Sequence, residues 1–92
     1  MNNIWIFRNG GTSIECTSFP FAYRSMWYAL KKNAEAGRSN EEMIKHLLII
    51  SPVKDRYGQK KVYDYDDATT MATAQGLLGA DGQINSREFK RK

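Results

Sequence analysis

The chain has 92 residues, of which 41% are hydrophobic and 26% charged. These values are typical of one globular domain with a single small core and exclude an intrinsically disordered chain. Fourteen lysines and arginines against ten acids give a formal net charge of +4, which favours anionic partners. No apolar run approaches the length that crosses a bilayer, so we expect no membrane partner.

The cysteine count and the amino-terminal residues bear on location. The single cysteine, Cys16, cannot form an internal disulfide, which fits a reducing compartment. The sequence begins Met1-Asn2-Asn3 and continues directly into apolar residues, without the basic start and long apolar run of a secretory signal. We therefore expect a cytoplasmic protein.

The first elements predicted are two strands in a hairpin. Residues 3–8 are bulky and apolar with little alternation, which favours a strand covered on both faces. Asn9-Gly10-Gly11 supplies residues that tolerate a positive φ and predicts a tight turn. In residues 12–17 polar side chains alternate with Ile14 and Cys16, the pattern of a returning strand.

A helix rich in aromatic residues follows and shows the longest helical pattern in the chain. Ser18 is placed to cap this helix, and Pro20 suits its first turn. Gly37 is placed to end it. Its predicted inner face consists of Tyr23, Met26, Trp27, Leu30 and Ala34. Its outer face carries Arg24, Tyr28, Lys31 and Lys32, a basic strip that contains an aromatic residue.

A second helix is predicted after Ser39, because Ser39 and Glu42 have the spacing of a capping box. Its predicted inner face is Met43, Ile44, Leu47 and Leu48. The β-branched pair Ile49-Ile50 is expected to lie at the end of this helix or already in a strand, since Pro52 disfavours a helix before it.

The remaining chain predicts a second hairpin and a third helix. Residues 53–55 and 60–65 flank a turn that contains Gly58, and Asp66 or Asp67 would cap a helix over 68–75. Ser86 is a candidate cap for one last turn, and 87–92 form a flexible basic tail. The sum is a small α+β domain over 1–92, approximately ββααββα, with two hairpins packed on the aromatic helix.

Two groups of acidic residues are candidate metal-binding sites. Asp81, Gly82 and Glu88 match the second half of an EF-hand loop, but Leu77 and Gly79 occupy its first and third ligand positions, so we expect no calcium site. Asp64, Asp66 and Asp67 could hold magnesium for phosphoester hydrolysis. Helix capping is the commoner role of such residues, and we expect neither a metal nor another cofactor.

Cys16 and His46 contain the minimum chemistry of a thiol–imidazole dyad. Cys16 alternates with polar residues in a predicted strand, which indicates a small buried hydrophobe rather than a nucleophile. No third residue that would orient the imidazole is evident nearby. We therefore expect no catalytic residues and a protein that is not an enzyme.

The remaining sequence pattern that bears on function is a set of basic residues interleaved with aromatic ones. The second hairpin carries Arg56, Lys60 and Lys61 for phosphate contact and Tyr57 for stacking on a base. Arg24, Lys31 and Lys32 of the aromatic helix would support them. This pattern predicts a nucleic-acid-binding surface, provided that the two basic segments meet in the fold.

Four stretches carry a resemblance to a known class of proteins: 4–9 (IWIFRN), 14–20 (IECTSFP), 75–78 (QGLL) and 81–89 (DGQINSREF). Together they look similar to small early-region proteins of T-even-like tailed phages. The resemblance implies an accessory protein of the infected cell's cytoplasm that takes over or inhibits host machinery by binding. One group of such proteins counters RNA-cleaving toxins, which would suit a basic chain.

The leading hypothesis is a non-enzymatic accessory protein that binds nucleic acid, with RNA as the expected form, and that inhibits a host factor or defence toxin. The first alternative is a protein–protein inhibitor or assembly module whose aromatic residues form a hot spot, including a homo-oligomer that buries some of them. The second is a metal-dependent nuclease built on Asp64, Asp66 and Asp67.

Overall fold

The computed structural model describes residues 3–79 and 82–84 and confirms the α+β order ββααββα. Its elements are β1 (Trp5–Asn9), β2 (Thr12–Cys16), α1 (Phe19–Glu35), α2 (Asn40–Ile44), β3 (Leu47–Lys54), β4 (Lys60–Tyr63) and α3 (Tyr65–Ala74). Within these described ranges no helix is long and apolar enough to cross a membrane. Ser86 and the tail 87–92 lie outside the described residues.

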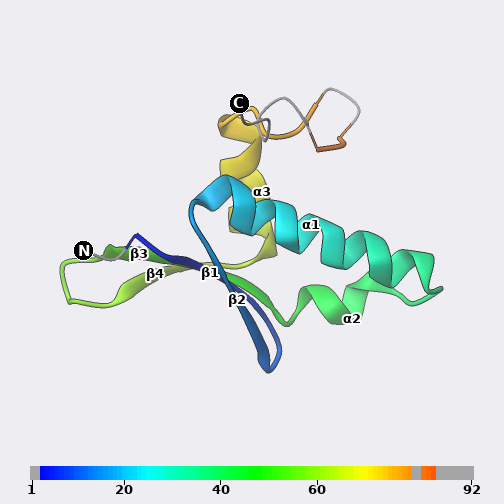
Figure 1. Cartoon of the computed structure of the whole chain (residues 1–92), viewed down its shortest axis with the longest axis horizontal. Helices are drawn as coiled ribbons and strands as arrows, with labels where there is room; N and C mark the ends of the chain where they lie inside the picture. The colour runs from blue at the N-terminus through cyan, green and yellow to red at the C-terminus, as the bar shows by residue number, and fades with distance from the viewer. Residues whose placement is uncertain (1–2, 80–81, 85–92) are drawn as a thin grey trace.

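The two hairpins join into one four-stranded antiparallel sheet of order β2-β1-β3-β4. The central contact is the pairing of β1 with β3, in which Phe7 lies opposite Ile49. α1 and α3 both cover the same face of the sheet (Figure 1). In the sheet that residues 3–79 and 82–84 form, β2 and β4 are therefore the two edge strands.

The register separates the side chains into a covered and an uncovered face. Phe7 and Ile49 lie opposite each other and are buried under the helices, and Tyr63 continues their row. On the other face Ile6, Ile50 and Val62 form a row, with Val62 exposed. The expectation that residues 3–8 are covered on both faces is wrong for the described part of the chain, because α1 and α3 lie on one side only.

An aromatic cluster holds the start of α1 on the sheet. The ring of Phe19 lies 5.5 Å from Trp5 of β1, 6.5 Å from Tyr63 of β4 and 6.1 Å from Tyr23, measured between centroids. Trp5 and Tyr63 stack at 6.3 Å. Phe19 thereby connects both hairpins to α1, and such aromatic pairs add to the stabilisation from buried area.

The predicted inner face of α1 is correct in the middle and wrong at its end. Tyr23 and Met26 are buried, but Ala34 is exposed, and the sequence pattern missed buried Phe19 and Ala22. The reason is that the last turns of α1 extend beyond the sheet (Figure 1). There the amide of Asn33 donates to the carbonyl of Ser39 at 3.0 Å and to Oδ1 of Asn40 at 2.8 Å, which ties α1 to α2.

The second predicted helix is shorter than expected. Leu47 and Leu48 belong to β3 and not to α2, which is confined to Asn40–Ile44. Ser39 does cap α2, but its Oγ accepts from the N–H of Glu41 at 3.2 Å and not from that of Glu42, which the predicted capping box requires. The β-branched residues after Leu48 favour an extended chain, and pairing with β1 extends the strand back to Leu47.

The third helix begins earlier than predicted. Asp64, rather than Asp66 or Asp67, is its cap, and its Oδ1 accepts from the N–H of Asp67 at 2.8 Å. Asp66 and Asp67 lie in the first turn, where carboxylates stabilise the positive end of the helix. Buried Ala68 and Ala72 let α3 approach the core closely, and Leu77 packs into the core after the helix.

Met26→Ala tests the position of the core. Met26 has no exposed surface, so we expect the free energy of unfolding in urea to fall by about 2–5 kcal/mol through lost burial and the cavity left behind. Met43→Ala is the matched control, because Met43 is half-buried at the periphery and its loss should be clearly smaller. An equal loss at the two sites would contradict this core.

Asp64→Ala tests the cap of α3. Removal of the carboxylate leaves an amide at the helix start without its partner and should lower the free energy of unfolding by about 1 kcal/mol. Asp64→Asn should preserve most of the stability because the amide oxygen can accept the same hydrogen bond. If urea melts show both variants equally destabilised, charge and not capping explains the role of Asp64.

Candidate functional site

The turn of the β3–β4 hairpin has a defined structure. Oδ1 of Asp55 accepts from the N–H groups of Tyr57 at 2.9 Å and Gln59 at 3.0 Å. Gly58 takes a positive φ of 81° and its N–H donates to the carbonyl of Asp55 at 3.0 Å. The single acid between Lys54 and Lys61 is thus occupied in holding the turn, and the predicted role of Gly58 is confirmed.

The same turn carries four exposed cations and one exposed aromatic residue. Lys54, Arg56, Lys60 and Lys61 are all exposed, and the side chain of Tyr57 is 80% exposed. Lys54 and Lys60 are register partners on β3 and β4. Like charges at opposite positions destabilise a hairpin, so this cluster has an energetic cost that a bound anion would relieve.

The other predicted basic residues lie elsewhere. Figure 1 places the carboxyl-terminal end of α1, which carries Lys31 and Lys32, and the β3–β4 turn at opposite ends of the longest axis, which measures 40 Å. Arg24 lines a pocket together with residues of β2, and no residue of the β3–β4 turn belongs to that pocket. The structure therefore brings Arg56, Tyr57, Lys60 and Lys61 together but does not join Arg24, Lys31 and Lys32 to them.

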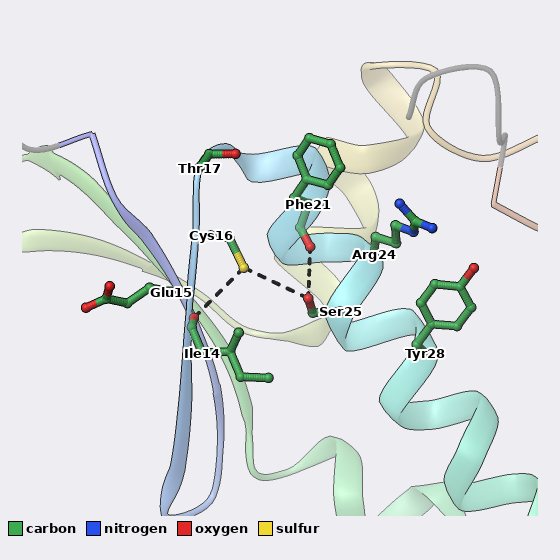
Figure 2. Close-up of a pocket in the computed structure, with 8 residues that line it drawn as sticks. All are labelled: Ile14, Glu15, Cys16, Thr17, Phe21, Arg24, Ser25 and Tyr28. Atoms are coloured by element: carbon green, nitrogen blue, oxygen red, sulfur yellow. Dashed lines mark hydrogen bonds between the residues drawn. The ribbon is translucent and has the colours of Figure 1, made fainter. Parts of the chain in front are cut away.

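A groove of about 500 Å³ lies between the edge strand β2 and α1 (Figure 2). β2 and the residue after it contribute Ile14, Glu15, Cys16 and Thr17, and α1 contributes Phe21, Arg24, Ser25 and Tyr28. The guanidinium of Arg24 lies 5.4 Å from the centre of the Tyr28 ring, a cation–π contact. Sequence reasoning missed this groove, because nothing local shows that residues 12–16 form an edge strand.

Cys16 lies at the inner wall of the groove with little nucleophilic character. Its Sγ is 3.9 Å from the carbonyl oxygen of Ile14 and 3.9 Å from Oγ of Ser25, which itself donates to the carbonyl of Phe21 at 3.1 Å (Figure 2). Burial raises the pKa of the Cys16 thiol, and the hydrogen bonds with Ser25 and the Phe7 backbone only partly oppose this. The thiolate is therefore scarce at neutral pH.

The structure also separates the two members of the candidate dyad. Cys16 pairs with Trp5 at one end of β1, whereas the carbonyl of His46 accepts from Gly10 beyond the other end. The imidazole of His46 is exposed, with Nε2 at 3.5 Å from a carboxylate oxygen of Glu42. Cys16 and His46 do not form a dyad in this fold.

The acidic candidates have structural roles. Asp64 is occupied as the cap of α3, and Asp66 and Asp67 follow in its first turn. Among residues 3–79 and 82–84 no group of three His, Cys, Asp or Glu side chains could hold a metal ion. Glu88 of the partial EF-hand pattern lies outside the described residues.

Comparison of the chain with known protein families, with curated proteins and with solved structures gave no match.

Alkylation by iodoacetamide tests the state of Cys16. Iodoacetamide reacts with the thiolate, and burial both raises the pKa of the Cys16 thiol and restricts the access of the reagent. We therefore expect the native protein at pH 8 to react at least about tenfold more slowly than the protein unfolded in urea. A Cys16→Ala/Thr17→Cys variant is the control, since Thr17 is exposed and its thiol should react at nearly the unfolded rate. Equal native and unfolded rates for the original chain would contradict the buried thiol.

Proposed function

We propose that this chain is a nucleic-acid-binding protein without catalytic activity, and that the β3–β4 hairpin is its binding surface for single-stranded RNA. The observation that carries the proposal is the presence of four exposed cations in the same hairpin turn as Tyr57, which is itself 80% exposed. Ammonium and guanidinium groups neutralise phosphates, and a phenol ring can stack on an unpaired base. The resemblance to phage early-region proteins supports a role in binding in the infected cell.

The geometry of the turn favours a single strand over a duplex. Tyr57 lies at the tip of a narrow hairpin and has cations before and after it in the chain. A single strand can place a base on the ring while its phosphates follow the lysines, whereas bases in a duplex are stacked on each other. The N–H groups of Tyr57 and Gln59 donate to the Asp55 carboxylate and hold the tip in shape, so little conformational entropy is lost on binding.

The hypothesis of a protein–protein module remains a second candidate. A different surface supports it, namely the groove beside β2, which is an edge strand of the sheet that the described residues form. That surface lies apart from the hairpin tip, so the two functions are compatible in one chain.

Fluorescence anisotropy with a labelled uridine oligomer of about ten nucleotides tests the RNA proposal. We expect micromolar affinity at low salt and a slope of about −3 for log K against log salt, because four cations each contribute about 0.7. Lys60→Ala should weaken binding several-fold and reduce the slope by about 0.7. Tyr57→Ala should weaken binding by about tenfold with the slope unchanged, and Tyr57→Phe should preserve it.

Lys32→Ala is the matched control, because Lys32 is an exposed cation at the far end of the molecule. It should leave RNA affinity unchanged. A loss of RNA affinity as large as that of Lys60→Ala would indicate that α1 contributes to the binding surface. Absence of binding at low salt would exclude RNA as the ligand.

A further inference from the structure

A second groove, of about 520 Å³, lies between β4 and α3 and has a volume typical of sites for small ligands. We call it the α3 groove. Its two walls are neighbours in the chain, because only Asp64 separates β4 from α3. The hydrogen bond from the N–H of Asp67 to Oδ1 of Asp64, at 2.8 Å, fixes the first turn of the α3 wall. The geometry of this groove is therefore set locally.

The β4 wall connects the α3 groove to the basic hairpin turn. Successive side chains of a strand point to opposite faces, so Lys61 shares the face of Tyr63, which the helices cover, and not that of Lys60. Lys61 accordingly lines the α3 groove and also belongs to the exposed cations of the turn. A phosphate bound at Lys61 therefore brings its nucleoside to this groove.

The α3 wall provides both apolar and hydrogen-bonding side chains. Asp67, Thr70 and Ala74 lie on one side of α3 at helical spacing, and all three are exposed. Between them Met71 is half-buried, as is Tyr63 on the other wall. The α3 groove thus combines an apolar interior with a few polar groups that can orient a ligand, the usual construction of a small-ligand site.

Opposite charges on the two walls favour a nucleotide as the occupant. Lys61 contributes a cation and Asp67 a carboxylate, and in the described part of the chain no ion pair joins them. A nucleotide can present its phosphate to Lys61 and the donors of its base to Asp67. An acidic peptide would be repelled by Asp67 and a basic one by Lys61.

The carboxylate of Asp67 also selects among the bases. A carboxylate accepts hydrogen bonds and donates none. Guanine presents two adjacent donors, N1–H and N2–H, on the Watson–Crick edge, which proteins read on unpaired bases. Adenine and cytosine have an acceptor next to the amino group, and the N3–H of uracil lies between two carbonyl oxygens. Guanine is the base that donates two hydrogen bonds to one carboxylate.

We propose that the α3 groove is a guanine subsite of the RNA-binding surface. The Asp67 carboxylate accepts from N1–H and N2–H of the base, the ring lies against Met71 and Ala74, and Lys61 binds the phosphate. This inference rests on the proposed function and adds a base preference to it. Stacking on Tyr57 does not supply such a preference, because every base has a face that can stack.

Fluorescence anisotropy with labelled oligomers of about ten nucleotides tests the subsite. The oligomers are uridine throughout except for one guanosine, placed at each position in turn, with adenosine and cytidine at the same positions for comparison. We expect one position at which guanosine raises the affinity about tenfold over the other three bases, since a matched bidentate contact discriminates by roughly that factor.

Two negative results have different meanings. If the oligomers bind in a manner that depends on Tyr57 but all four bases are equivalent at every position, the guanine subsite is wrong and the hairpin proposal stands. If no oligomer binds at low salt, the proposed function itself is wrong.

Matched variants locate the subsite, with the ratio of the affinities for the guanosine and uridine oligomers as the readout. Asp67→Asn should bring this ratio close to one, because the amide places a donor against the donors of guanine. Asp66→Asn removes the same charge from the same turn of α3, but Asp66 does not line the α3 groove, so the ratio should be unchanged. Ala74→Phe fills the groove from an exposed position without a change of charge and should also lower the ratio. An unchanged ratio in both groove variants would exclude this site.

Competition by guanosine monophosphate distinguishes a subsite for RNA from a site for a free nucleotide. We expect the mononucleotide to displace the guanosine oligomer only at concentrations about a hundredfold or more above the dissociation constant of the oligomer, since it lacks the contacts with the hairpin turn. Displacement at concentrations near that constant would assign the α3 groove to a free nucleotide and overturn RNA as the source of the guanine.

Discussion

The position of Phe19 determines how the rest of the molecule is arranged. Its ring contacts Trp5 of β1 and Tyr63 of β4, which lie on different hairpins, and Tyr23 one turn further along α1. Since Phe19 is the first residue of α1, these contacts fix where the helix starts on the sheet and the direction it takes. The burial of Met26 and Ile49 follows from that placement.

This placement also explains why both candidate surfaces lie at the margins of the fold. α1 and α3 fill one face of a sheet of four strands, so the β3–β4 turn projects beyond the core and the β2 edge stays next to α1. The turn combines charge with an exposed ring, whereas the edge combines main-chain groups with apolar walls. The two surfaces therefore differ in chemistry, since the first is charged and aromatic and the second is a strand edge beside apolar side chains.

The accuracy of the sequence predictions depends on how local each feature is. Neighbouring residues alone decide where a turn or a helix cap forms. The prediction was therefore correct for the turns at Gly10 and Gly58 and for the cap by Ser39. The assignment of Leu47 and Leu48 to a helix was wrong because a short apolar run fits a helix or a strand equally well. The cap by Asp64 was missed because Asp64, Asp66 and Asp67 lie within four positions, and the sequence pattern does not show which of them precedes the first turn of the helix.

The sequence by itself determined the class of the fold, the order of its elements and the basic, aromatic composition of the β3–β4 turn, because periodicity, glycine position and charge are local properties. Only the tertiary structure decided that β1 pairs with β3, which makes β2 an edge strand and creates the groove beside Arg24. It also decided that Lys31 and Lys32 lie far from the turn. Such relations depend on contacts between distant residues, and hydrophobic packing against α1 selects among the strand orders that the same local pattern permits.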